Sequence, residues 1–161
     1  MAVAARIEEV RNELTDLAER SRSAAELMQS VVKLLHDRML KYNWVGFYLL
    51  EPGAEPPVLV LGAFEGAMTP HTRIPLNQGI CGAAASSGQT VVVDDVNKDP
   101  RYLACSLETK SEIVVPVFVC GKIVGELDID SHFPAAFTPE HQALVQYCAQ
   151  VVGRKMEAFQ A

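Results

Sequence analysis

Three carboxylates stand at the ends of one apolar segment and are the first candidates for chemistry in this sequence. Asp128 and Asp130 close the segment two residues apart, so in a strand they would share one face. Glu112 stands where the segment begins. If the three converge on buried strands, a cation, a proton or solvent must relieve their charge. They indicate either a site that binds a cation and donates a proton, or strand ends that reach solvent, where acids are common.

The segment between these acids predicts a β-hairpin. Two apolar runs rich in β-branched residues flank a Cys-Gly-Lys sequence at residues 120–122. Both faces of each run are apolar, which favours a central hairpin covered on both sides. With a three-residue turn, Val119 pairs with Ile123, and Glu112 then lies opposite Asp130. A two-residue turn would place Glu112 on the other face, so the register decides whether the acids meet.

Two cysteines lie where the chain could bring a thiol to these acids. Cys81 follows Gly79 in a small-residue run that predicts a short helix, and the dipole at a helix N-terminus favours a thiolate. Cys105 lies in a polar loop, residues 94–108, that can fold a thiol back over the carboxylates. The alternatives are a small residue in a tight turn for Cys81 and an incidental loop cysteine for Cys105.

An aromatic pair offers an apolar wall. Trp44, Gly46 and Tyr48 alternate along a predicted strand, so the two rings share a face with a glycine between them. This spacing predicts a shallow notch between the rings. The alternative is two core aromatics beside a close approach of the backbone.

Helical and extended patterns surround these residues. Apolar stripes predict helices in residues 2–20, after a capping box at Ser23 and Glu26, and after Thr138. Neighbouring strands joined by turns favour an α+β fold with an antiparallel sheet and its helices gathered on one side. The predicted strands are residues 42–50, 58–64, 90–93, 113–119 and 123–129.

Composition narrows the class of protein. The chain has 161 residues, enough for one domain with a large core, and its net charge of −6 argues against nucleic acid and anionic membrane as partners. No apolar run reaches the length of a membrane span and no signal pattern opens the chain, so we expect a cytoplasmic protein. In a cytoplasmic chain the four cysteines are not expected to form a disulfide framework, and their spacing argues against structural zinc. We expect Cys148 to be a packing residue and Cys120 to have no role.

Six short motifs together resemble those of the GAF-domain free methionine-(R)-sulfoxide reductases. They stand at residues 43–48, 61–64, 73–75, 79–82, 111–116 and 127–131. The resemblance implies a single GAF domain over 1–161, with N-terminal helices in 1–40, sheet and active-site loops in 41–131, and a C-terminal helix in 138–159. It implies an antiparallel sheet of about six strands, with the N- and C-terminal helices packed on one face, and a homodimer.

The same resemblance implies roles for individual residues. Cys105 would be the catalytic cysteine and Cys81 a resolving cysteine, and the remaining site residues would bind substrate: Trp44, Tyr48, Glu112, Asp128 and Asp130. Many members carry a further cysteine just before the Arg-Ile-Pro motif, where this chain has His71. The resolving role would therefore fall to Cys81 alone.

The implied activity is reduction of free methionine-(R)-sulfoxide through a cysteine sulfenic acid and a disulfide, recycled by thioredoxin without metal or organic cofactor. The acids suit the substrate's ammonium group, and a protonated Asp130 or Glu112 would supply the proton. One alternative is a GAF module that senses a small molecule such as a cyclic nucleotide, although three acids would repel a phosphate. The other is a thiol redox sensor without turnover.

Overall fold

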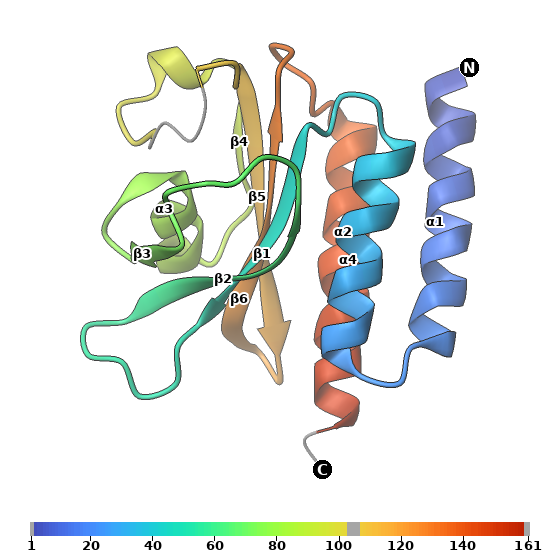
Figure 1. Ribbon diagram of the computed structural model, residues 1–161, viewed down its shortest axis with the longest axis horizontal. Helices are drawn as coiled ribbons and strands as arrows, with labels where there is room; N and C mark the ends of the chain where they lie inside the picture. The colour runs from blue at the N-terminus through green and yellow to red at the C-terminus, as the bar shows by residue number, and fades with distance from the viewer. Residues whose placement is uncertain (1, 103–106, 160–161) are drawn as a thin grey trace.

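The computed structural model describes residues 2–102 and 107–159, and its centre is a six-stranded antiparallel sheet (Figure 1). The strand order is β3-β2-β1-β6-β5-β4, so the predicted hairpin pairs with the first strand at the middle of the sheet. The strands are β1 (Trp44–Leu50), β2 (Val58–Glu65), β3 (Arg73–Pro75), β4 (Val91–Val93), β5 (Ser111–Val119) and β6 (Lys122–Ser131). The short β3 was not among the strands predicted from pattern.

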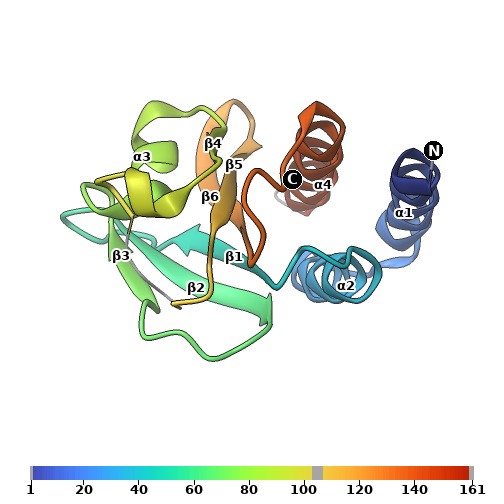
Figure 2. The ribbon, with the colours of Figure 1, turned by 90° about the horizontal axis from the view of Figure 1, so that it is seen from above.

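Helices cover both faces of this sheet. The long helices α1 (Ala2–Arg20), α2 (Ala24–Arg38) and α4 (Pro139–Ala158) gather on one side, and α3 (Gly79–Ser87) lies on the other (Figures 1 and 2). Figure 2 shows α2 and α4 next to the sheet and α1 outside them. The predicted α+β fold, with an antiparallel sheet and its terminal helices on one side, is therefore confirmed, and α1 packs on the other two helices.

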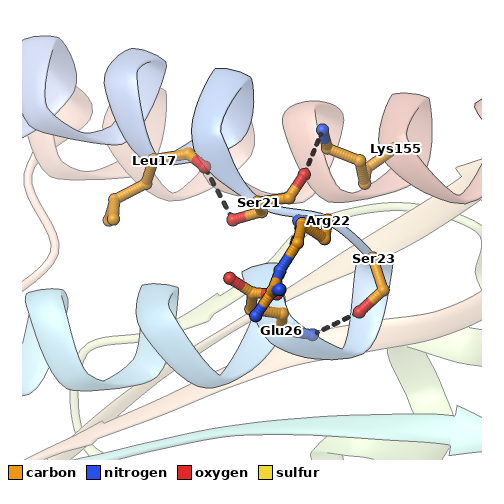
Figure 3. Close-up of polar contacts among 6 residues, drawn as sticks. All are labelled: Leu17, Ser21, Arg22, Ser23, Glu26 and Lys155. Atoms are coloured by element: carbon orange, nitrogen blue, oxygen red, sulfur yellow. Dashed lines mark hydrogen bonds and ion pairs between the residues drawn. The ribbon is translucent and has the colours of Figure 1, made fainter.

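The corner between α1 and α2 explains why the N-terminal stretch forms two helices (Figure 3). The Ser21 hydroxyl donates to the carbonyl of Leu17 at 2.6 Å and closes α1. Ser23 then accepts from the backbone N–H of Glu26 at 3.1 Å, which is the predicted helix cap. Lys155 of α4 donates to the Ser21 carbonyl at 3.0 Å and ties the corner to the C-terminal helix.

The sheet separates two apolar cores. The larger core lies under the long helices and contains Val45, Phe47, Ile113 and Leu127 from the strands. The smaller core lies under α3 and contains Trp44, Tyr48, Val114, Ile80 and Cys81. Successive residues of one strand alternate between the two cores, which explains why the hairpin is apolar on both faces.

The hairpin reaches its predicted register by an unexpected route. Its turn has two residues, Cys120 and Gly121, both with positive φ (50° and 77°), and Val119 pairs with Lys122. The predicted three-residue turn was therefore wrong. An irregularity between Val117 and the next residue of β5 then shifts the pairing by one position. Glu112 consequently lies opposite Asp130, and that pairing is confirmed.

Two smaller features complete the description. A 3₁₀ turn (Val96–Lys98) follows β4 and lies near the start of the predicted loop over residues 94–108. Within the described ranges, no helix combines the length and apolarity that a membrane crossing requires.

Candidate active site

The three predicted acids meet on the α3 side of the sheet. In β6, Asp130 pairs with Glu112 of β5 on one side and with Trp44 of β1 on the other. Asp128, two residues earlier, points to the same face. All three carboxyls are at least 95% buried. The reading in which these acids are solvent-exposed strand ends is therefore wrong.

Helix α3 closes this face and brings Cys81 to the acids. Gly79 opens the helix with φ 70°, a conformation that favours glycine, and Cys81 follows in its first turn. Gly82 packs so closely on the preceding segment that a Cβ there would lie 2.8 Å from the Leu76 carbonyl oxygen. The Cys81 thiol donates to Asp128 Oδ2 at 3.4 Å. The glycines on either side of Cys81 thus allow α3 to pack close to the sheet and place the thiol next to the carboxyl cluster.

Burial and mutual repulsion set the protonation of the acids. The pKa of Glu112 is raised well above its usual value, first by burial and then by the negative charges of Asp128 and Asp130. The pKa of Asp130 is also raised well above its usual value, by burial and then by Asp128. Hydrogen bonding to the two aspartates raises the pKa of Glu112 further, whereas the same contacts lower theirs. Burial and mutual repulsion therefore favour a proton held within the cluster of Glu112 and the two aspartates.

The Cys81 thiol does not gain the thiolate character predicted from the helix dipole. Burial raises its pKa well above the usual value, and the charges of Asp128, Glu126 and Glu112 raise it further. The helix N-terminus contributes a fraction of a charge, which burial and the three nearby acidic groups outweigh. The prediction of a dipole-activated thiolate was wrong, and Cys81 is a neutral thiol in this structure.

The aromatic wall has a different shape from the predicted notch. The rings of Trp44 and Tyr48 lie 6.2 Å apart between centroids, and the Trp44 ring also stacks on Phe64 at 5.8 Å. A Cβ on Gly46 would lie 2.7 Å from Cζ3 of Trp44 and closer still to Cη2. The indole itself therefore fills the space above the glycine, and its Nε1–H is fixed by the carbonyl of Ala67 at 3.0 Å.

A small cavity of about 20 Å³ lies between the acids, α3 and the segment before β3. Its lining includes Tyr48, Cys81, Glu112, Asp128 and His71. One ligand atom each from Cys81, Glu112 and Asp128 lies within 4.8 Å of the other two. Such a group of oxygen and sulfur atoms can surround a cation, and both an ammonium group and a metal ion fit that description.

The other three cysteines lie in different parts of the chain. Cys105 lies outside the described residues, so the structure does not place the predicted catalytic thiol. Cys148 is buried in the larger core on α4, and Cys120 is exposed in the hairpin turn. Both positions lie away from the acids, as predicted.

A fourth acid, Glu126, was missed in the sequence. It precedes Asp128 by two residues in β6, so it points to the same face, where it lies opposite Tyr48. Its side chain is fully buried, and neither carboxyl oxygen has a hydrogen-bond partner among the residues that the structure describes. The spacing of residues 126, 128 and 130 was the available signal, but the apolar context of the hairpin hid it.

Comparison with known proteins assigns the family. The GAF domain model matches residues 23–156. The free methionine-R-sulfoxide reductase of Escherichia coli is 42% identical over 119 residues, which is 73% of this chain and 69% of that protein. The reductase of the same name from Saccharomyces cerevisiae is 47% identical over 89 residues, 55% of this chain and 48% of the yeast protein. This chain thus spans about half the length of the yeast relative.

Solved structures agree with this assignment. The free methionine-R-sulfoxide reductase of Neisseria meningitidis, whose structure holds its substrate, superposes with a TM-score of 0.89 at 34% identity. The match covers 96% of this chain and 90% of that protein. These matches agree with the sheet, the buried acids and the helix that carries Cys81. The chain therefore belongs to the GAF domain family and, within it, to the free methionine-R-sulfoxide reductases.

Proposed function

We propose that this protein reduces free L-methionine (R)-S-oxide to L-methionine with cysteine thiols. One observation carries the proposal: three buried carboxyls share a face beside an aromatic wall, and Asp128 Oδ1 and Asp130 Oδ1 lack hydrogen-bond partners among the described residues. Buried acceptors without partners are costly, and an ammonium group supplies the donors that they need. The relatives named above act on free methionine-R-sulfoxide according to their names, which supports this choice of ligand.

The cluster also accounts for selectivity. A methionine sulfoxide inside a peptide has no free ammonium, so it would leave the carboxyls buried and unpaired. The methyl end of the free amino acid would contact the Trp44 ring, which its bond to Ala67 holds in place. The same acids disfavour a cyclic nucleotide, because its phosphate would meet Glu112 and Asp130.

The reduction of the sulfoxide then proceeds in three steps. The Cys105 sulfur attacks the sulfoxide sulfur while the sulfoxide oxygen is protonated. The S–O bond of the substrate then breaks and the oxygen passes to the Cys105 sulfur, which gives methionine and a sulfenic acid on Cys105. Glu112 is the proposed donor of the proton, because its pKa is raised by burial and by the two aspartates. The Cys81 thiol then condenses with the sulfenic acid, which forms a disulfide and releases water. A dithiol, for which we propose thioredoxin, finally reduces the disulfide.

The test is turnover coupled to thioredoxin, thioredoxin reductase and NADPH. We expect NADPH consumption with the free R epimer, and none with the free S epimer or the N-acetylated R epimer. Cys105→Ser should abolish methionine formation, and Cys120→Ser, a cysteine away from the acids, is the matched control. Intact thiols without any turnover would instead support a redox sensor or a ligand-sensing module.

Homodimerisation and cytoplasmic location remain predictions of the sequence. The long helices lie on one side of the sheet, and α1 is the outermost of them (Figure 2). We propose that a second copy packs on these helices. Light scattering should give twice the mass of one chain, and a monomeric mass across the working concentration range would refute the dimer.

A further inference from the structure

The Cys81 thiol and the carboxyl cluster form a group of ligand atoms that suits a metal ion. The sulfur of Cys81 and one oxygen each of Glu112 and Asp128 all lie within 4.8 Å of one another. The three residues come from α3, β5 and β6, and each is at least 95% buried. Because they belong to three separate elements, no spacing in the sequence reveals them as a set.

The distance between the sulfur and one carboxyl oxygen is that of two ligands on a single ion. Cys81 Sγ lies 3.4 Å from Asp128 Oδ2. A tetrahedral zinc ion, with a Zn–S bond of about 2.3 Å and a Zn–O bond of about 2.0 Å, holds such atoms about 3.5 Å apart. Two oxygens on this ion lie about 3.3 Å apart, so Glu112 has to approach Asp128 by at most about 1.5 Å. An ion can therefore replace the thiol proton with little movement of the side chains.

Two further observations indicate a ligand at this place. Asp128 Oδ1 and Asp130 Oδ1 are buried and have no hydrogen-bond partner in the part of the chain that the structure describes. Asp130 shares its face of β6 with Asp128 and pairs with Glu112, so it is placed to supply a fourth ligand. The cavity of about 20 Å³ beside Cys81 exceeds the roughly 10–15 Å³ that one water occupies, which leaves space for a single ion.

The donor atoms select the kind of ion. A thiolate is a soft ligand that Zn²⁺ and similar transition metal ions accept, whereas Mg²⁺ and Ca²⁺ prefer oxygen ligands alone. We propose that Cys81, Glu112 and Asp128 bind a divalent cation of the zinc class, and that this ion excludes the substrate. As the ion binds, the Cys81 S–H proton and any proton held by the carboxyls are released to solvent.

An ion in this position acts as an inhibitor of the proposed reaction. It occupies the oxygens of Glu112 and Asp128 that the substrate's ammonium group needs, and it holds the Cys81 sulfur that must form the disulfide. The inhibition rests on the proposed function, because it concerns the same substrate and the same thiol. Binding of the ion itself does not depend on that function.

Cobalt is the probe for the site, because a bond between Co²⁺ and a thiolate absorbs in the near ultraviolet. The full chain with Cys105→Ser, Cys120→Ser and Cys148→Ala retains Cys81 as its only cysteine, so this absorption band reports Cys81 alone. We expect the band to saturate at one equivalent of Co²⁺ and to disappear when Zn²⁺, which binds more tightly, is added. It should also be absent after Cys81→Ala. A folded chain that shows no band with Co²⁺ would overturn the proposal.

Glu112→Gln and Asp128→Asn test the two carboxyl ligands in the same chain. Each should weaken Co²⁺ binding at least about 10-fold, since loss of a group that only orients a ligand already costs about 10–100-fold in metal affinity. Glu19→Gln removes the same charge from an exposed position on α1 and is the matched control, with unchanged affinity expected. Circular dichroism verifies that each variant is folded. Unchanged affinity in both carboxyl variants would refute an ion shared with Cys81.

Competition tests the exclusion of the substrate. With free Co²⁺ fixed by a chelating buffer, free methionine-(R)-sulfoxide should weaken the cobalt band, and its N-acetylated form, which has no ammonium group, should not. A band that the free amino acid leaves unchanged would overturn the exclusion. A cobalt band together with no thioredoxin-coupled turnover of the parent chain would refute the proposed function and leave the metal site standing. Turnover without a cobalt band would refute the metal site alone.

Discussion

Gly46 lies directly beneath the Trp44 ring, so Gly46→Ala tests the aromatic wall without changing any polar group. A Cβ there would lie 2.7 Å from Cζ3 of Trp44, nearer to Cη2, and 3.1 Å from Cβ of Phe64. Ordinary contacts begin at 3.4 Å, so the indole must move by about 1 Å. The ring cannot move freely, because Phe64 stacks on it and the Ala67 carbonyl holds its Nε1–H.

The size of the effect follows from that displacement. Overpacking of this kind costs about 1–3 kcal/mol, which lowers the melting temperature of a chain this long by about 2–12 °C. A misplacement of about 1 Å at a site that positions substrate can cost about 10²-fold in rate. We therefore expect Gly46→Ala to lose about 10²-fold in kcat/KM for the free R epimer while the chain still folds.

Steady-state turnover and thermal melting measure the two effects separately. Gly62→Ala is the matched control, because a Cβ at that position meets nothing closer than 3.5 Å. It should change kcat/KM by less than about twofold, since ordinary contacts need no rearrangement. If Gly46→Ala lowers the melting temperature but keeps the kcat/KM of the parent chain, the Trp44 ring is a core residue only and the reasoning is refuted.

Three further predictions concern the acids. Glu112→Gln should lower kcat/KM about 10- to 100-fold with the free substrate, since charge-assisted hydrogen bonds contribute about 1.5–3 kcal/mol; an unchanged value would remove Glu112 from the site. Methionine binding should release protons, because the ammonium lowers pKa values that burial and neighbouring charge have raised, and calorimetry in buffers of different ionisation enthalpy measures this release. Zero release would mean that the acids are already ionised. The stability of Glu126→Gln relative to the parent chain should increase with pH. A carboxyl whose folded pKa is raised binds more protons in the folded state, so its contribution is lost as pH rises above its unfolded pKa. Melting curves from pH 4 to pH 8 that stay parallel would contradict a raised pKa at this residue.

The strand pattern could be predicted because alternation along a strand is a local property. Asp128 and Asp130 share a face in any strand, and the acids and aromatics converge once β1 and β5 flank β6. The register of Glu112 could not be derived from the turn alone. A two-residue turn and an irregularity at Val117 shift the pairing in opposite senses, and their cancellation depends on packing across the sheet.

The properties of the thiols were harder to predict, because they depend on burial that spacing does not reveal. Cys81 does stand at the start of a helix, but burial decides the sign of its pKa shift, and the acids of the neighbouring strands raise that pKa further. Glu126 escaped notice for the same reason: in the sequence it is one acid in an apolar strand. Its cost becomes visible in the structure, where the residue has no exposed surface and its carboxyl oxygens have no partner among the described residues.

The cluster is a site in which buried carboxyls without partners raise the free energy of the protein when no ligand is bound. Glu112, Asp128 and Asp130 each lose hydration on folding, and their raised pKa values express that loss in the absence of a ligand. A cationic ligand recovers part of this free energy, so affinity and selectivity for a free amino group share one origin. A fourth buried acid raises the cost again without adding an ammonium ligand.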